Sequence, residues 1–360
     1  MSRTMIQAHR EIFRILDDFC SARKDPVQNA AEIRYISGPT TEEKKFLQEA
    51  QCKIKLEFTA TRRTILYDFE NKSYFCLIGF DNSSDFSSIH EELVNGGNFT
   101  AVIADLTPKP VASTSEIRNI VEAQDKRLGA SYKGHSQELI ATLFPSVRIF
   151  SGEQVTEEEA YRAFFRFCLF ECQFNDFWIS TDLAQSLIQL CDVDSLKIPY
   201  QTLCRSIFDA DPAALFLGLY RCIEALYALK TTSLLIGELS LKIDWNDMCV
   251  LLEKRLGWRA PEAASLNSLL TLGDEQDLKN VLHAIGHSSD FEMPALANAA
   301  GRQIYSLRNA LVHFRPIHHK TEFERVDWNQ LCRSIASLVH DIYEKIYLNQ
   351  EGNDLDATEI

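Results

Sequence analysis

The sequence predicts an α+β protein in which a small N-terminal α/β domain precedes an all-α helical bundle. From about residue 50 to residue 152, short segments rich in β-branched and aromatic residues alternate with turn residues, as strands do. After residue 152 the apolar residues recur at helical spacing instead. A chain of 360 residues is longer than one core usually supports, so we expect two domains.

The N-terminal half is predicted to contain one amphipathic helix and the α/β domain. Residues 1–27 have apolar residues along one side of a helix. The α/β domain spans 28–152, with a helix expected at 114–127. Its strands are expected in the segments KIKLEFTATRRTILYDF, KSYFCLIGF, FTAVIADL and VRIFSG. Asp105 lies near the C-terminal end of one of these segments, where α/β ligands bind, although an aspartate that simply forms a turn is the simpler interpretation.

The C-terminal half is predicted to be helical throughout. Residues 153–204 form a helical connector, 205–348 the helical bundle, and the polar residues 349–360 a disordered tail. Asp211 followed by Pro212 is a specific start signal, because proline fits the first position of a helix. Further helices are expected at 244–256, 276–287, 294–312 and 321–348.

Composition excludes several classes of protein. Hydrophobic residues make up 46% and charged residues 24%, which is typical of a globular chain. The first 25 residues lack the apolar run of a signal peptide, and no segment approaches the roughly 18 apolar residues of a membrane span. We therefore expect a cytoplasmic protein with no membrane association. Most of the ten cysteines have apolar neighbours, which favours reduced thiols in the core.

Common cofactor and metal motifs are absent from the sequence. It contains no P-loop, dinucleotide-binding, nucleophile-elbow or CxxC pattern, so we expect no cofactor. His283 and His287 are four residues apart and could share a metal, but a zincin would need glutamate at position 284, where this chain has Ala284. Cys168 and Cys172 have the same spacing on an apolar helix and favour core packing. We expect no metal site.

The charge of the chain changes sign in one region. The net charge is −14, which argues against general coating of nucleic acid. Residues 302–333 nevertheless contain six basic and three acidic residues. This stretch includes YSLRNALVHFRP, where Arg308, Asn309 and His313 interrupt an apolar helix.

An arginine followed by a histidine after four to six residues occurs three times, so spacing alone cannot select a site. The other matches are Arg3 to His9 and Arg333 to His340. Only Arg308 is followed directly by asparagine. Asn309 and His313 are i and i+4, which places them on one helix face, and Pro316 predicts that His313 lies in the last helical turn.

These residues resemble the hallmark of the HEPN superfamily (higher eukaryotes and prokaryotes nucleotide-binding). Its members carry arginine, a polar residue and histidine at this spacing near the end of a late helix, and Arg308, Asn309 and His313 match position by position. The resemblance covers about 205–348. LYRCIEALYALK looks like the early helix that packs beside the motif helix, with Glu224 facing the site in some members.

The resemblance implies a metal-independent endoribonuclease that acts as a homodimer. Arg308 would bind phosphate, Asn309 would orient His313 or the phosphate, and His313 would transfer protons, since its unperturbed pKa lies near neutrality. One histidine per motif suggests that two copies supply the acid and the base. The residues expected to bind the RNA are Arg315, His318, Lys320 and Glu224.

Two alternatives remain open at this point. Some HEPN domains are catalytically inactive and serve as nucleotide-binding or regulatory interaction modules. The motif could also be purely structural, with Arg308 and Asn309 bridging helices and His313 bonded to a carbonyl. The N-terminal domain has no counterpart, and we expect a sensor that answers to a small-molecule or protein trigger. By analogy, the whole would be a toxin or antiphage defence effector.

Overall fold

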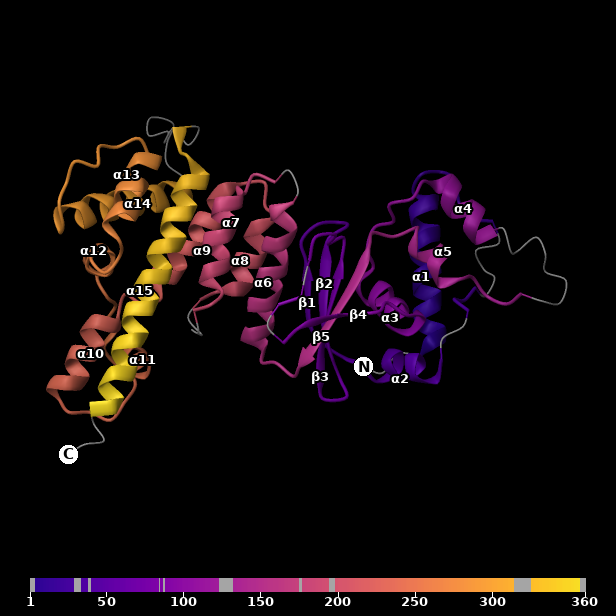
Figure 1. The fold of residues 1–360 in the computed structure, drawn as a ribbon, viewed down its shortest axis with the longest axis horizontal. Coiled ribbons are helices and arrows are strands. Elements are labelled where there is room, and N and C mark those ends of the chain that lie inside the picture. The colour runs from indigo at the N-terminus through magenta and orange to yellow at the C-terminus, as the bar shows by residue number, and fades with distance from the viewer. Residues whose placement is uncertain are drawn as a thin grey trace. The chain divides into compact units, whose positions relative to one another are not determined.

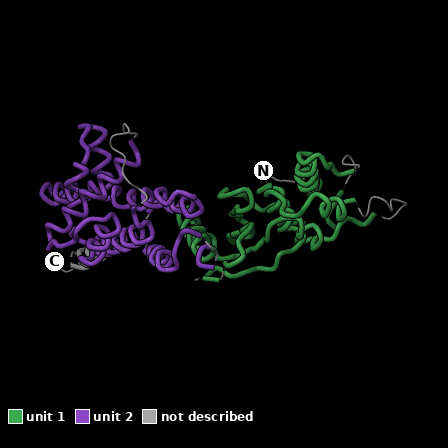
Figure 2. The backbone as a smooth tube through the Cα atoms, turned by 90° about the horizontal axis from the view of Figure 1, so that it is seen from above, with its two compact units in different colours: residues 1–171 green, residues 172–360 purple. Residues whose placement is uncertain are grey.

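The computed structural model divides the chain into two compact units, Met1–Glu171 and Cys172–Ile360 (Figure 2). It describes residues 4–28, 34–37, 40–83, 85–86, 88–122, 132–174, 177–193, 198–313 and 325–356, without the side chains of 347–356. Helices make up 58% of the chain, and a small antiparallel sheet lies in the first unit. The predicted α+β fold class is therefore confirmed.

The first unit is built on an antiparallel sheet with the strand order β1-β2-β3-β5-β4. The strands are β1 Gln51–Glu57, β2 Arg63–Phe69, β3 Lys72–Ile78, β4 His90–Glu92 and β5 Val147–Glu153. A two-residue turn, Glu70 and Asn71, joins β2 to β3 with φ angles of 48° and 60°. Left-handed turn residues match the twist of the two flanking strands. Three of the four predicted strand segments are thus confirmed.

The fourth segment, FTAVIADL, forms a helix and not a strand. It belongs to α3 Gly96–Leu106, which Asn95 begins by accepting hydrogen bonds from the N–H groups of Gly97 and Asn98. Because α3 is buried over most of its surface, its sequence lacks the polar face that would reveal helical spacing. Asp105 accepts a hydrogen bond from the Tyr67 hydroxyl at 2.7 Å, so it lies on a helix and not at a strand end.

Helices cover both faces of the sheet (Figure 1). One layer contains α1 Met5–Ser21, α2 Thr41–Glu49, α3, α4 Thr114–Glu122 and α5 Gln137–Ala141. Ile65, Tyr67 and Cys76 point into the core beneath that layer. The alternate residue Phe75 points to the opposite face and contacts Phe164 of α6 Glu157–Gln173, with 5.4 Å between ring centroids. The helix α6 is therefore the second layer of the first unit.

This second layer moves the unit boundary away from the one that the sequence suggests. The strand pattern ends near residue 152, but the compact unit extends to Glu171, because most of α6 packs on the sheet. The expected connector, 153–204, is thus divided. Its later helices, α7 Thr181–Leu190 and α8 Tyr200–Ile207, belong to the second unit.

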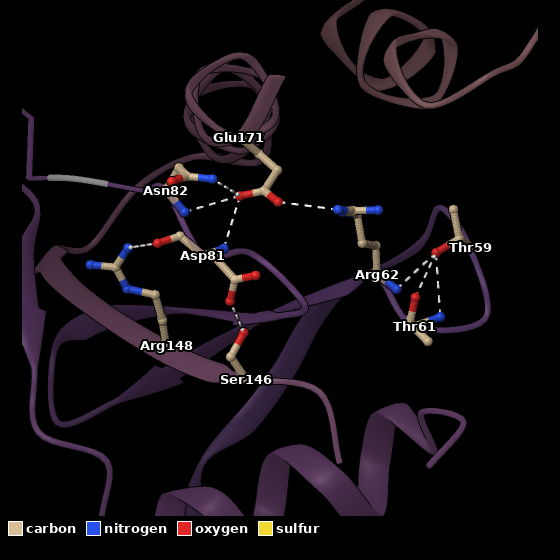
Figure 3. A network of polar contacts seen from close by, with 8 residues as sticks. All are labelled: Thr59, Thr61, Arg62, Asp81, Asn82, Ser146, Arg148 and Glu171. Atoms are coloured by element: carbon tan, nitrogen blue, oxygen red, sulfur yellow. Dashed lines mark hydrogen bonds and ion pairs between the residues drawn. The ribbon is translucent and has the colours of Figure 1, made fainter. Parts of the chain in front are cut away.

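A fully buried carboxylate ties α6 to two loops of the sheet (Figure 3). Glu171 accepts hydrogen bonds from the N–H groups of Asp81 at 2.8 Å and Asn82 at 3.0 Å, just after β3. Its other oxygen pairs with Arg62, in the loop before β2, at 3.2 Å. A buried charge is tolerated only when it is paired and hydrogen-bonded in this way. Glu171 therefore fixes the helix to both loops at once.

The second unit consists of helices. After α7 and α8 come α9 Pro212–Glu224, α10 Leu229–Glu238, α11 Trp245–Leu256, α12 Glu262–Leu270, α13 Glu275–Ala284, α14 Ala295–Val312 and α15 Trp328–Asp356. The long helix α15 packs against α7, α9 and α13. It continues to Asp356, so the prediction of a disordered tail from 349 is wrong as far as 356. The segment has no proline, and Gly352 does not end the helix, which continues through it.

Two further sequence predictions are confirmed in the described residues. Asp211 caps α9 by accepting a hydrogen bond from Ala213 N–H at 3.0 Å, and Pro212 occupies the first turn. All ten cysteines are free thiols, most of them buried.

One described stretch, Pro212–Glu238, has the length and apolar composition of a membrane span. It comprises α9 and α10, and 67% of its most apolar window is buried inside the protein.

We predict that Glu171→Ala lowers the free energy of unfolding by about 3–5 kcal/mol, because it leaves Arg62 and two backbone N–H groups without their buried acceptor. Chemical denaturation measures this. The control is Glu57→Ala, which removes an ion pair to Arg63 whose glutamate side chain is 55% exposed. That change should cost less than about 1 kcal/mol. Equal losses in the two variants would contradict the role of Glu171.

A buried histidine on α1 makes the first unit sensitive to acid. His9 is 5% exposed, and its Nε2 has no hydrogen-bond partner among the described residues. Burial lowers its pKa from 6.5 to about 4. In the unfolded chain His9 therefore binds a proton below pH 6.5, whereas in the folded chain it binds one only below about pH 4. Stability from neutral His9 is complete above pH 6.5 and is lost as the pH falls toward 4.

We predict that His9 alone removes up to about 3 kcal/mol of stability between pH 7 and pH 4, at roughly 1.36 kcal/mol per pKa unit. His9→Leu should flatten the dependence of the unfolding free energy on pH in this window. Denaturant unfolding at several pH values tests it. His90→Leu, whose histidine side chain is 68% exposed, should retain the wild-type slope. An unchanged slope in His9→Leu would refute the assignment.

Candidate functional site

The motif residues meet α9 at the C-terminal part of α14. The Arg308 guanidinium donates to the Asn309 side-chain oxygen at 3.0 Å and to the Glu224 carboxylate at 3.4 Å. Glu224 is the last residue of α9, so the two helices that the sequence selected do lie together. The Arg308 side chain is 19% exposed and that of Glu224 is 36% exposed. The pair is therefore partly open to solvent.

A buried tyrosine ring contacts the guanidinium, and a second buried tyrosine is hydrogen-bonded to the first. The Tyr220 ring lies under Arg308, with 5.5 Å between the guanidinium carbon and the ring centroid. Tyr227 donates its hydroxyl hydrogen to the Tyr220 hydroxyl at 2.7 Å. Burial raises the pKa of both phenols, so both stay neutral at physiological pH. A neutral aromatic face attracts a cation without neutralising it, so the Tyr220 ring leaves the charge of Arg308 intact, and only the Glu224 carboxylate offsets part of that charge.

His313 lies one residue beyond the last helical residue, and not in the last helical turn as predicted. The helix α14 ends at Val312, and His313 has extended backbone angles, φ −106° and ψ 118°. Its backbone N–H still donates to the Asn309 carbonyl at 3.0 Å. The side chain is exposed, and within the described part of the chain no hydrogen bond joins the imidazole to Arg308, Asn309 or Glu224. Asn309 therefore orients Arg308 here and not His313.

The remaining predicted RNA-binding residues fall outside the described chain. Arg315, His318 and Lys320 all belong to residues 314–324, about which the structure says nothing. The described site therefore consists of Arg308, Asn309, His313 and Glu224, with the two tyrosines.

The two competing Arg–His matches form no comparable cluster among the described residues. Arg333 pairs with Asp182 of α7 at 3.2 Å, and His340 lies 3.7 Å from its neighbour Asp341. His9 is part of the buried face of α1, and Arg3 lies outside the described residues. Arg308 is thus the match that combines an aromatic support with a carboxylate partner from another helix.

A shallow pocket of about 240 Å³ lies beside this cluster, at the beginning of α10. Tyr227 and Lys230 contribute to one wall. Ala264 and Ser265 of α12, with Pro261 just before that helix, contribute to the other. The Lys230 ammonium donates to the Ser268 hydroxyl at 3.2 Å. Sequence reasoning missed these residues. The tyrosines and Lys230 stand in the quoted segment LYRCIEALYALK, but helical spacing alone assigns the tyrosines to the core.

Metal-ligating side chains do not gather in the described residues. No group of three or more histidine, cysteine, aspartate or glutamate side chains has the geometry to hold an ion there. The helix α13 ends at Ala284, so His283 and His287 do not share one helix face as their spacing suggested. The described groups of the candidate site are a guanidinium, a carboxylate, an amide, an imidazole and two phenols.

Comparisons with known proteins leave the family of the chain open. No family model matches it, and no curated protein or solved structure shows significant similarity. The chemistry of the site therefore rests on its own residues.

We predict that Glu224→Gln strengthens the binding of a short single-stranded RNA by roughly two- to fivefold, because it frees Arg308 from an ion pair worth less than about 1 kcal/mol. Fluorescence anisotropy at constant salt measures the affinity. Glu275→Gln removes the same charge from a separate ion pair, with Lys279, and should leave affinity within about a factor of two. Weaker binding by Glu224→Gln would mean that Glu224 itself contacts the RNA.

Proposed function

We propose that this protein is a metal-independent endoribonuclease of the HEPN type. The observation that carries the proposal is the Arg308 cluster. Its guanidinium is held by Asn309, Glu224 and the Tyr220 ring, five residues before an exposed histidine at the end of the same helix. Cleavage of an RNA phosphodiester requires a cation that stabilises the developing charge and a side chain that can transfer a proton, and a guanidinium and an imidazole are groups of these two kinds.

The reaction uses the nucleophile that RNA itself carries. A base takes the proton of a ribose 2′-hydroxyl, and the 2′-oxygen attacks the adjacent phosphorus. The bond from phosphorus to the 5′-oxygen breaks, and an acid protonates that oxygen. The products are a 2′,3′-cyclic phosphate and a 5′-hydroxyl. Arg308 stabilises the extra negative charge on the phosphate oxygens, and His313 transfers a proton.

The acid and the base need two imidazoles, and the motif supplies one. A composite site with His313 from each of two copies provides both. The proposal therefore includes a homodimer with RNA as substrate. It also includes a cytoplasmic location without membrane association, a trigger that acts through the first unit, and a role as a toxin or antiphage effector.

A second candidate is a nucleotide-binding module without catalysis. The ion pair with Glu224 and the pocket beside Tyr227 favour it, because a partly neutralised arginine and a recess suit a bound mononucleotide. In that case Arg308→Ala would abolish nucleotide binding, measured by calorimetry, and no preparation would cut RNA.

We predict that the purified protein cleaves total cellular RNA in excess EDTA, and that Arg308→Ala and His313→Ala each lower the rate by at least about a hundredfold. Gel electrophoresis measures the rate, and end-group analysis should find cyclic phosphates. A proton-transfer role also predicts a pH–rate profile that Arg308→Ala leaves unshifted and His313→Ala changes in shape.

Two variants serve as matched controls. Arg302→Ala removes an exposed arginine from the same helix, and His287→Ala removes an exposed histidine. Both should cut RNA at the wild-type rate. If all variants cut equally, the motif is not the active site. If the wild type is inert both in the tube and when produced in cells, the catalytic proposal is wrong.

A further inference from the structure

The hairpin of α10 and α11 exposes several apolar side chains in the second unit. The two helices pack against each other, and Met248 of α11 is buried. Other apolar side chains of the hairpin are exposed, namely Leu234, Leu239, Leu241, Val250, Leu251 and Leu256. A surface of this kind, rimmed by charged residues, marks a contact with another molecule.

The charges on the outer face of α11 are self-complementary: the face can pair with a second copy of itself. Asp247, Val250, Leu251 and Lys254 are i, i+3, i+4 and i+7, so they form one stripe along the helix. All four are exposed. The apolar pair lies in the middle, with a negative group toward the N-terminus and a positive group toward the C-terminus.

A second copy of the same helix, packed antiparallel about a two-fold axis between Val250 and Leu251, complements this stripe. Val250 then lies opposite Leu251 of the partner subunit, and Asp247 lies opposite Lys254 of the partner subunit. The symmetry makes both contacts twice, as self-complementary two-fold interfaces require. A different protein would have no reason to match this symmetry. Two copies of a chain with net charge −14 repel each other, so a neutral, self-matching stripe is a favourable place for them to meet.

We infer that the Asp247–Val250–Leu251–Lys254 stripe of α11 is the surface through which two copies of this chain associate. The hairpin begins beside the Arg308 cluster, since α10 starts five residues after Glu224 and Tyr227 bonds to Tyr220. The inference that α11 pairs with α11 of a second copy depends only on the residues of the stripe. Its role in forming a two-histidine site rests on the proposed ribonuclease function.

A charge-reversal experiment on the full chain tests the pairing. Sedimentation velocity over a wide range of concentration should show a dimer for the wild type. Asp247→Lys places Lys opposite Lys twice, and Lys254→Asp places Asp opposite Asp twice, so each variant alone should dissociate at least about tenfold more readily. An equal mixture of the two variants should form a heterodimer, because every facing pair then has opposite charges. This recovery also shows that both variants are folded.

The helix dipole gives a competing reason for acid at the start and base at the end of α11. The double variant Asp247→Lys with Lys254→Asp distinguishes the dipole explanation from the contact between copies. Its charges oppose the helix dipole, yet each lysine again faces an aspartate of the partner subunit. It should dimerise like the wild type. Glu253→Lys is the matched control for Asp247→Lys: it makes the same charge change on α11 outside the stripe and breaks an exposed pair with Arg259. It should leave the dimer intact.

The outcomes separate this inference from the proposed reaction. A wild type that stays monomeric at every concentration overturns the inference, as does a mixture of folded variants that stays monomeric. Single variants that dimerise normally show that another surface is used. If the mixture restores the dimer and no preparation cuts RNA, the interface stands and the ribonuclease proposal falls. If RNA is cut equally by monomeric variants, the two-copy site is wrong while the interface remains.

Discussion

The helix α9 is apolar on nearly every side, so other helices must pack around it to keep its side chains from water. This constraint organises the second unit. Its neighbours are α8, α12, α14 and α15. Gly218 lets α8 approach so closely that an added Cβ would lie 2.9 Å from a Leu203 methyl group. The Tyr343 hydroxyl of α15 donates to the Cys222 carbonyl at 2.8 Å. Because α9 is fixed on these sides, its final turn presents Tyr220 and Glu224 to α14 at a set position, and the candidate site follows from the core.

The elements that sequence predicted well are those with a polar face and a clear end. The helix α14 was expected at 294–312 and runs from Ala295 to Val312, because a buried stripe and a proline just beyond it define its limits. The segment FTAVIADL failed because burial of most of α3 removes the spacing that distinguishes helix from strand. The boundary at 152 failed for another reason. The sheet needs a second apolar layer, and nothing local in the sequence of α6 says that the layer belongs to the strands before it.

The candidate site was predictable in part. Arg308, Asn309 and Glu224 were selected from spacing and resemblance, and they meet through hydrogen bonds and an ion pair. The sequence could not predict that Asn309 bonds to Arg308. Its i, i+4 relation to His313 made a contact with the imidazole an equally good expectation. The support from Tyr220 and Tyr227 was missed, since a buried tyrosine in an apolar helix is first explained by packing. Only contacts between helices distant in the chain show that the Tyr220 ring lies against the Arg308 guanidinium and that Tyr227 is bonded to Tyr220.

The place of Glu171 at the very end of the first unit has a practical consequence for dividing this protein. The chain that follows the last strand contributes half of the covering of the sheet, and its final carboxylate holds two loops that were formed about a hundred residues earlier in the sequence. Any exchange of the N-terminal half between proteins, whether by recombination or by design, must therefore carry α6 with it. A cut at the end of the last strand would leave Phe75 and Phe150 facing water and Arg62 without its buried anion. The segment that must be transferred as one piece therefore extends to Glu171, well beyond the last strand.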